Sequence, residues 1–380
     1  MFQSFVVYSL CMLFMILFAS LKSCKISGFP YSIPIGIILS ILLYSFIFGV
    51  RYGVGMDFFA YLDTYNIAIS KGLNYLRFEP GFLLLVDYCT RFKLHFSIFF
   101  AIIALIQISF LLFAFKDKKL LPYIIFALFC LDILSWQNGL RQIISVSIFI
   151  FAIKYIRDGF WLKYILFIAV ALLFHKSAII LFPVYFILRR NCLNKQWSIS
   201  LQLIVLLIVV AIGPQVSSIS NLIFSKFDFI FNEFDYSEYA NYTKISSSSR
   251  GVGFLCNLII ICVLISYSNK LKLFFKNDSF YIFYTLSYFG YLFMNLTIGS
   301  IILNRPNYYF NGLFFVSVAY LMRYLYLNFR TNTIDKLSFV LVTFLLLSLF
   351  LFMVIKGDST TARYFFFWND EITSYYFINA

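Results

Sequence analysis

Charge is scarce in this 380-residue chain: only 12% of the residues are Asp, Glu, Lys or Arg, whereas 62% are hydrophobic. A soluble domain has about 25% charged residues and cannot bury so much apolar surface. Apolar runs of about 18 residues or more recur, and a helix of that length crosses the hydrocarbon core of a bilayer. The runs are continuous and do not alternate, which excludes a membrane-spanning β-barrel. The composition therefore predicts an all-α integral membrane protein.

Patterns that bind metals, disulfides or nucleotides are missing as well. There are only two histidines, His95 and His175, and seven cysteines without a C-x-x-C pair. A zinc ribbon and a disulfide framework are therefore excluded. The stretch "GVG" (53–55) matches neither a dinucleotide fingerprint nor a P-loop, and the N-terminus lacks the features of a signal peptide. We expect no metal, no cofactor and a retained first span.

The apolar runs predict about twelve spans within a single polytopic domain, residues 1–380. We place them at 3–20, 31–50, 95–115, 120–135, 138–156, 160–174, 177–189, 200–217, 252–268, 279–298, 308–325 and 337–355. Three connections on one side are long, at 51–94, 218–251 and 356–380, and functional loops are seldom trimmed to the minimum. We expect short interfacial helices in the first of them, because the segment from residue 81 is too short to span.

The basic residues orient these spans, because short cytoplasmic connections are enriched in Lys and Arg. One set of connections carries 17 basic and four acidic residues, and the opposite set carries 13 and 12. The basic set holds the cations at 22–25, 116–119, 154–163, 189–195, 270–276 and 323–336. It is expected to be cytoplasmic, so both termini and the long loops lie outside. The net charge of +14 is therefore a topology signal and does not indicate nucleic acid.

The stretch "VRYGVGMDFFAY" (50–61) places Arg51 at the end of the second span and Asp57 six residues later. In "RFEPGFLLLVDY" (77–88), Glu79 precedes Pro80 at the start of a short helix, where a carboxylate complements the helix dipole. Each stretch also has a purely structural interpretation. Residues 50–61 could be an amphipathic helix in the headgroups with Arg51 snorkelling, and residues 77–88 could be an ordinary helix with an acidic N-terminus. Both alternatives stay open.

Two further stretches place polar groups at the outer ends of spans. "SWQNGLRQIISVSIF" (135–149) puts Arg141 and Gln142 in the first turn of a span. The free energy of inserting an arginine in a span is unfavourable by about 2.5–3.5 kcal/mol, so such an arginine is usually paired or functional. Asp132 is a possible structural partner. "LLFHKSAIILFP" (172–183) puts His175 and Lys176 in a break between apolar runs. A lone histidine is more often structural than catalytic, so that alternative also remains.

The second half of the chain adds Arg250 before the ninth span and "NRPNYYFNGL" (304–313) at the eleventh. In the latter, Arg305 lies beside a polar stripe that is expected to line a groove or cavity. The stripe consists of Asn304, Asn307, Tyr308 and Asn311. Together the outer cations imply an anionic ligand, because guanidinium groups match phosphate oxygens in a bidentate way. A lipid phosphate or pyrophosphate at the membrane surface fits.

The motifs "RYGVGMDFFAY", "FEPGF", "GLRQIIS", "FHKSAII" and "NRPNYYF", in this order, resemble the EpsG family of Wzy-like polysaccharide polymerases. The resemblance spans residues 45–325 and implies an enzyme of O-antigen, capsule or exopolysaccharide assembly, similar to glycosyltransferases of the GT-C class. It implies a bacterial cytoplasmic-membrane location and repeat units linked to undecaprenyl pyrophosphate as substrate. A flippase and a chain-length regulator are the other partners that it implies, beside the membrane lipids.

Under that resemblance, cations stabilise the pyrophosphate as it leaves, and a carboxylate accepts the proton of the acceptor hydroxyl. The expected base is Asp57 or Glu79, with His175 and Arg141 also in the catalytic centre. The expected pyrophosphate ligands are Arg51, Arg141, Lys176, Arg250 and Arg305. Gln142 joins the asparagine and tyrosine stripe in the acceptor groove. The alternatives are a lipid-linked oligosaccharide flippase, a membrane acyltransferase, an O-antigen ligase-like transferase and a purely structural membrane protein.

Overall fold

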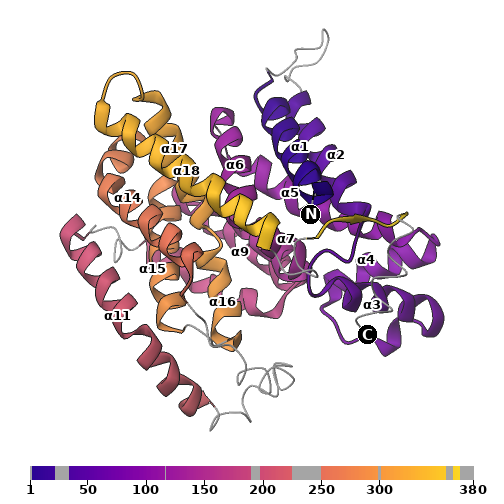
Figure 1. Ribbon diagram of the computed structural model, residues 1–380. Helices are drawn as coiled ribbons and strands as arrows, with labels where there is room; N and C mark the ends of the chain where they lie inside the picture. Colours follow the sequence, from indigo (N-terminus) through magenta and orange to yellow (C-terminus); the bar gives the residue numbers. More distant parts are fainter. Residues whose placement is uncertain are drawn as a thin grey trace. The chain divides into compact units, whose positions relative to one another are not determined.

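The computed structural model describes residues 2–21, 34–115, 117–189, 197–224, 250–297, 301–356 and 363–368 (Figure 1). Side chains are described for all of these except 217–224, 301–304 and 356. Most of the expected outer loop 218–251 and C-terminal segment 356–380 lies outside the described residues, as does the side chain of Asn304.

Helices dominate the described residues, and six of them are long and apolar enough to cross a membrane. Two shorter apolar helices, Ile35–Gly49 and Trp161–Leu172, add to these. The prediction of an all-α membrane protein is confirmed, and each of the twelve expected spans coincides with helix over much of its described part. The count of twelve spans stays a prediction, since length and composition alone identify six.

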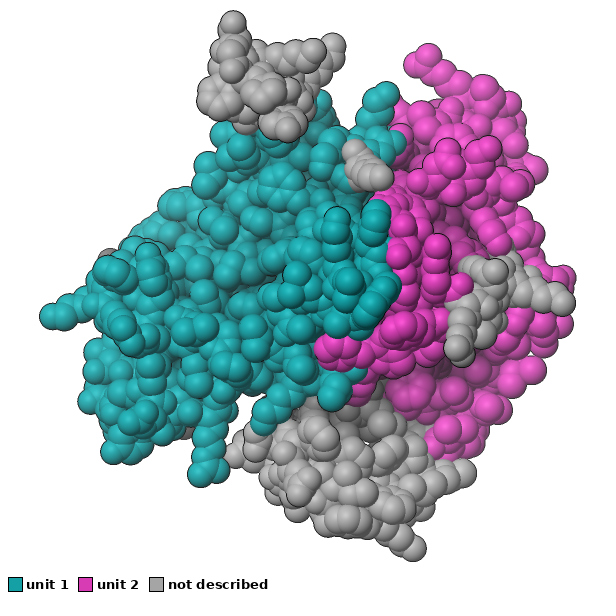
Figure 2. Space-filling view, turned by 180° about the vertical axis from the view of Figure 1, so that it is seen from behind, with its two compact units in different colours: residues 1–155, 160–179, 343–380 teal, residues 156–159, 180–342 magenta. Residues whose placement is uncertain are grey.

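The chain forms two compact units, residues 1–155, 160–179 and 343–380, and residues 156–159 and 180–342 (Figure 2). Three elements, α8, η3 and α18, pass from one unit to the other along the chain. The single domain remains a prediction, because compact packing units within one chain need not fold independently.

The first unit, unit 1, contains the N-terminal helices and the candidate site. Its helices are α1 (Phe2–Ala19), α2 (Ile35–Gly49), α3 (Phe58–Lys71), α4 (Pro80–Arg91), α5 (Phe96–Phe113), α6 (Leu121–Leu131), α7 (Ile133–Asn138), α8 (Leu140–Asp158) and α9 (Trp161–Leu172), with 3₁₀ turns η1 (Leu73–Tyr75), η2 (Lys118–Leu120) and η3 (Lys176–Leu181). Helix α2 packs against both α1 and α5. Gly36 and Gly49 permit this, since a Cβ atom would lie 1.9 Å from the Phe18 carbonyl oxygen and 2.6 Å from the Ala101 Cβ, respectively.

A two-residue strand near the C-terminus pairs with the chain directly after α2. Strand β2 (Phe365–Phe366) is antiparallel to β1 (Arg51–Tyr52), and the Phe367 amide donates to the Val50 carbonyl at 3.1 Å. Tyr364 is 1% exposed; its amide donates to Ser4 Oγ at 2.9 Å and its hydroxyl donates to the Ile47 carbonyl. This pairing was not predicted from the sequence, and it ties the C-terminal segment to the loop that begins at Arg51.

The second unit, unit 2, is built around α15, which packs against α11, α16 and α17. Its helices are α10 (Phe182–Arg189), α11 (Ile199–Phe224), α14 (Val252–Phe274), α15 (Phe280–Leu296), α16 (Ile301–Asn311), α17 (Phe314–Leu327) and the first part of α18 (Thr333–Lys356). Several buried polar groups form hydrogen bonds between helices here: Tyr284 donates to Gln202 Oε1, and Tyr288 donates to the Gln202 carbonyl at 2.9 Å. Such bonds between helices compensate the cost of burying polar atoms.

Candidate functional site

The loop between α2 and α3 docks on the corner between α7 and α8. The Asp57 amide donates to Asn138 Oδ1 at 2.9 Å, and Arg51 Nη2 donates to the Gln137 carbonyl at 3.2 Å. Gly55 has φ of +92°, and a Cβ atom there would lie 2.6 Å from that same carbonyl oxygen. The glycine therefore serves both the turn and the close approach. The stretches "RYGVGMD" and "QNGLR", 86 residues apart in sequence, come together in this way.

The start of α4 is fixed in a similar way against the end of α9. The Gly81 amide donates to the Leu173 carbonyl at 2.8 Å. A Cβ atom at Gly81 would also lie 2.8 Å from that oxygen, so no larger residue fits without a shift. Pro80 occupies the first helical turn and Glu79 is the N-cap residue of α4. The motif "FEPGF" is thereby held against "LLFHKS".

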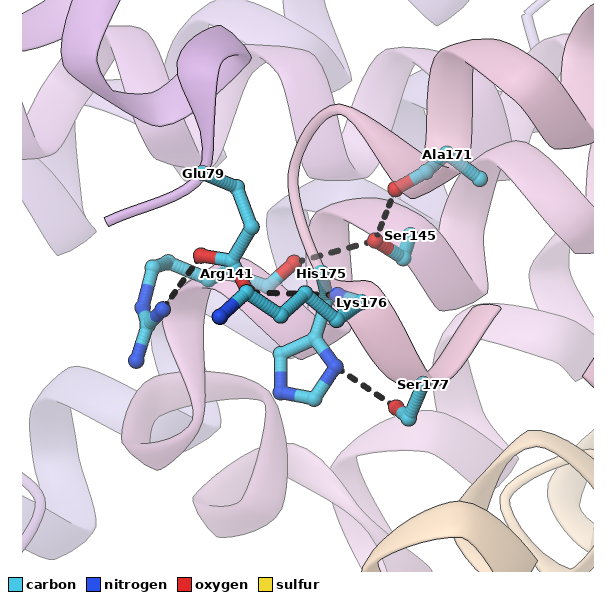
Figure 3. Close-up of polar contacts among 7 residues, drawn as sticks. All are labelled: Glu79, Arg141, Ser145, Ala171, His175, Lys176 and Ser177. Carbon is cyan, nitrogen blue, oxygen red and sulfur yellow. Dashed lines mark hydrogen bonds and ion pairs between the residues drawn. The ribbon is translucent and has the colours of Figure 1, made fainter. Parts of the chain in front are cut away.

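Glu79, Arg141 and Lys176 meet at one point in unit 1 (Figure 3). Arg141 Nη1 donates to Glu79 Oε2 in an ion pair, and the Lys176 backbone amide donates to Glu79 Oε1 at 3.1 Å. Glu79 is only 6% exposed, whereas the Lys176 side chain is exposed. Three elements, the N-terminus of α4, the first turn of α8 and the start of η3, thus share one carboxylate.

Two serines brace the residues on either side of this ion pair (Figure 3). Ser145 Oγ, one turn after Arg141, donates to the Ala171 carbonyl at 2.7 Å and so joins α8 to α9. Ser177 Oγ lies 2.6 Å from His175 Nδ1, which fixes the plane of the imidazole. His175 also lies close enough for its positive charge to act on Glu79.

Arg141 has an aromatic and phenolic environment besides its carboxylate. Its guanidinium carbon lies 4.5 Å from the Phe78 ring centroid and 5.8 Å from that of Phe82. It also donates a hydrogen bond to the buried Tyr61 hydroxyl. Among the described residues, no partner is found for Arg141 Nε, which is buried. A buried N–H without a partner is costly, so an anion that reached this atom would remove that cost.

The electrostatics separate the roles of the two carboxylates. Burial by itself would raise the pKa of Glu79, but the charge of Arg141, backbone hydrogen bonds and the charge of His175 outweigh it and hold the pKa below its usual value. A carboxylate with a lowered pKa is a weak base. Glu79 is therefore suited to holding Arg141. Asp57 is half-buried at the N-cap of α3, one turn before Tyr61.

Arg51 lies deeper than the other predicted phosphate ligands. Its side chain is 1% exposed, with the guanidinium carbon 5.4 Å from the Phe100 ring centroid and 6.0 Å from that of Phe58. Burial lowers the pKa of Arg51 to about 10, which still leaves it charged at neutral pH. A phosphate would reach Arg51 only if the loop at 51–57 moved, so this residue is better placed to fix the loop.

In unit 2, Arg250 presents donors much as Arg141 does in unit 1. Within the described part of the chain, its Nε and Nη2 atoms are buried and have no hydrogen-bond partner. The guanidinium carbon lies 5.0 Å from the Phe254 ring centroid, and Nη2 lies 3.3 Å from where a Cβ atom of Gly213 would be. Glycine at that position of α11 leaves room beside the arginine.

The polar stripe of α16 packs partly against α15. Asn307 is 4% exposed and its Nδ2 donates to the Gly290 carbonyl at 3.0 Å, while Asn311 Nδ2 lies 3.1 Å from Met294 Sδ. Arg305 and Tyr308 on the same helix are half-buried, as is Gln142 in unit 1. Of the predicted groove, two asparagines therefore have contacts that also join helices.

Comparison with known families now adds an independent finding. The model of the EpsG family matches residues 34–371, which is most of the chain. The chain belongs to the EpsG family. This confirms the resemblance drawn from the five motifs, and the family is one of Wzy-like polymerases. No curated protein and no solved structure matches the chain.

Three residues beside this candidate site were not predicted from the sequence. Tyr61 follows Asp57 by four residues, a spacing that places both on one face of α3. Asn138 and Ser177 were each within three residues of a selected motif residue, and each holds the loop or ring beside it. Nothing in a single sequence says which neighbour of a motif faces the same site.

Proposed function

We propose that this protein is a polysaccharide polymerase that joins oligosaccharide repeat units carried on undecaprenyl pyrophosphate, for O-antigen, capsule or exopolysaccharide synthesis. The support is membership of the EpsG family together with the Glu79–Arg141 ion pair and the buried Arg141 Nε, which has no partner in the described part of the chain. The reaction takes place on the outer face of the bacterial cytoplasmic membrane. The single observation that carries the proposal is a desolvated guanidinium, held by three motifs, with one donor left for an anion.

In the proposed reaction, a hydroxyl oxygen of the incoming repeat unit attacks the anomeric carbon of the growing glycan. The bond from that carbon to the pyrophosphate oxygen breaks, and its electron pair leaves on undecaprenyl pyrophosphate. The hydroxyl proton passes to a carboxylate. Negative charge therefore grows on the leaving group, and positioned cations stabilise the transition state more than the ground state. No nucleotide or other cofactor is consumed.

We assign the base to Asp57 and the orientation of Arg141 to Glu79. Glu79 already accepts bonds from Arg141 and from the Lys176 amide, and its lowered pKa makes it a poor proton acceptor. Asp57 lies on the same face of α3 as Tyr61, which contacts Arg141. His175 and the exposed Lys176 assist the departure of the pyrophosphate.

The other residues predicted from the sequence are proposed to bind phosphate, to hold a loop or to contact the acceptor sugar. Arg250 has buried donors without a partner among the described residues and is proposed to bind a phosphate. Arg305 is proposed to bind a phosphate as well. Arg51 is proposed to hold the loop that carries Asp57, as its burial supports. The acceptor sugar is proposed to contact a polar groove at Gln142, Asn304, Asn307, Tyr308 and Asn311.

The proposed topology has twelve spans with both termini outside and a GT-C-like bundle. The alternation of basic connections supports it. A flippase that supplies the lipid-linked units and a regulator of chain length are the proposed protein partners, and nucleic acid is not one.

Polymerisation by purified protein tests the proposal. We expect lipid-linked repeat units, incubated with the protein in vesicles without nucleotide, to yield polymer and free undecaprenyl pyrophosphate. Arg141→Gln should abolish both products, whereas Arg330→Ala, at an exposed turn of unit 2, should not. Movement of units across the bilayer without polymer would instead identify a flippase and refute the proposal.

A further inference from the structure

Helix α4 has one buried and one exposed apolar face. Phe82, Val86 and Cys89 are 0% exposed and pack inside unit 1. On another side of the helix, Leu84, Tyr88 and Phe92 are 67%, 53% and 64% exposed. Their spacing of four residues makes them one continuous stripe. A twelve-residue helix is too short to span a bilayer, so this stripe is not the lipid face of an ordinary span.

The ends of α4 adjoin two apolar helices of the same unit. At the N-terminus of α4, Gly81 is hydrogen-bonded to Leu173, which is 44% exposed and follows Leu166 (63%) on α9. Beyond the C-terminus of α4, four residues lead into α5, where Ile98 is 43% exposed. Helix α5 is a candidate membrane span, on which exposed apolar residues suit lipid. At either end of α4 there is therefore a neighbouring helix that also exposes apolar residues.

The neighbouring helix α3 provides the contrast. Its exposed positions include Asp63, Asn66 and Ser70, which suit water, beside the apolar Ile69, which is 58% exposed. The two helices are packed together, yet only α4 exposes large apolar residues at a regular spacing of four. A continuous apolar stripe is therefore found on α4 and not on α3.

Cations border the stripe. Arg77, Arg91 and Lys93 are all exposed, and the half-buried Asp87, whose Oδ2 lies 2.7 Å from Arg91 Nε, is the acid between them. Apolar and aromatic residues with flanking Lys and Arg are the pattern of helices that lie in the membrane interface and attract anionic headgroups. The aromatic members, Tyr88 and Phe92, suit the boundary between headgroups and acyl chains.

We propose that α4 docks on the surface of an anionic lipid bilayer through Leu84, Tyr88 and Phe92. This goes beyond the proposed function, because it names an interaction surface and holds whatever reaction the protein performs. Its consequence concerns the site: Glu79 is the N-cap residue of α4, so docking fixes the Glu79–Arg141 pair at the depth of the headgroups. A phosphate anchored by a lipid tail lies at that depth.

Spin-label accessibility tests the docking. The native cysteines are replaced in the full-length chain, and a nitroxide is attached at residue 88 or, as a matched control, at residue 66 of α3. In vesicles of phosphatidylglycerol and phosphatidylcholine, we expect the label at 88 to collide several-fold more with oxygen and several-fold less with a water-soluble nickel complex than the label at 66. Equal nickel access at both positions would overturn the proposal. Exclusion of both probes from residue 88 would also overturn it, and would indicate a protein partner on the stripe.

Charged substitutions provide a second, independent test. We expect Leu84→Glu with Phe92→Glu to abolish the oxygen accessibility of a label at 88, while Asn66→Glu leaves it unchanged. Replacing phosphatidylglycerol with phosphatidylcholine throughout should lower oxygen collision at 88 if Arg77, Arg91 and Lys93 contribute. No change in either experiment would contradict the assignment of this face to anionic lipid. Neither readout uses polymer formation, so its failure would leave the proposed function standing.

Discussion

At the scale of single residues, the protein places a half-buried arginine where three kinds of contact meet. Arg141 has the Glu79 carboxylate, the Tyr61 hydroxyl and the Phe78 ring around it, and one buried N–H without a described partner. Removing one member of a buried ion pair costs about 3–5 kcal/mol, because the other charge is left without compensation. A loss of activity in a single variant therefore needs a control that restores folding.

A paired substitution separates the two effects. We expect Arg141→Gln alone to lower the free energy of unfolding by about 3 kcal/mol, because the Glu79 carboxylate stays buried without its partner. Adding Glu79→Gln removes that charge and should restore much of the stability. Polymerisation should remain at least about 100-fold below wild type in the double variant, since a positioned cation contributes about that factor. Thermal unfolding and polymer yield measure the two quantities.

The pH dependence of stability is the control for this interpretation. The pKa of Glu79 in the folded protein lies below its unfolded value, which is about 4.3. The ion pair therefore stabilises the fold above that pH, and its contribution is lost as pH falls through the folded pKa. In Glu79→Gln, this part of the decrease in the free energy of unfolding at acid pH should be absent. If the free energy of unfolding of the variant falls at acid pH as steeply as that of the wild type, the Glu79–Arg141 contact is contradicted.

Tyr61 offers a second prediction at this scale. Tyr61→Phe removes a hydrogen bond to a charged group, worth about 1.5–3 kcal/mol, and should lower the polymerisation rate by about tenfold or more. Tyr65→Phe is the matched control on the same helix, because the Tyr65 hydroxyl donates to the backbone carbonyl of Leu94 at 2.6 Å. It should reduce stability and leave the rate per folded molecule unchanged. Equal rate losses in both variants would refute a positioning role for Tyr61.

Most of this site could be anticipated from the sequence, since Glu79, Arg141, His175 and Lys176 each stand out in an apolar context. What could not be anticipated is their pairing. From the sequence, Asp132 is one structural partner that Arg141 could have, because it is near in the chain, whereas the structure pairs Arg141 with Glu79, 62 residues away. A single sequence shows that a charge is costly to bury, but it does not show which residue will lie next to that charge and compensate it.

At the scale of elements, short connections between distant segments hold the site. Gly55 meets Gln137, Gly81 meets Leu173, and β2 pairs with β1. The helices themselves followed from apolar run length. The pairing of Phe365 and Phe366 with Arg51 and Tyr52 did not, because two residues carry no detectable strand pattern.

Ending the chain after residue 362 tests the role of that pairing. Removing Tyr364 exposes Ser4 and the Ile47 carbonyl and leaves β1 without its partner. We expect the truncated protein to insert in the membrane but to lose polymerisation, because Asp57 follows β1 by only five residues. Ending the chain after residue 368 keeps β2 and should retain activity. Full activity without residues 363–368 would show that β2 is dispensable.

At the scale of the whole molecule, the sequence predicts which side of the membrane each loop occupies, and the charge count does so without reference to the fold. Reporter fusions after residue 75, after residue 119 and after residue 305 test this arrangement. We expect 75 and 305 outside and 119 in the cytoplasm, according to the distribution of Lys and Arg. Residues 75 and 305 on opposite sides would refute the twelve-span topology.

Binding of a polyprenyl pyrophosphate to the purified protein tests the central claim most directly, namely that Arg141 grips the diphosphate. The wild-type protein should be compared with the double variant Glu79→Gln with Arg141→Gln, under conditions in which both proteins are fully folded. We expect the double variant to bind about 10- to 100-fold more weakly, which corresponds to the loss of charge-assisted hydrogen bonds. The corresponding polyprenol without phosphate should bind both proteins alike. Equal affinity of the two proteins for the pyrophosphate would contradict the account.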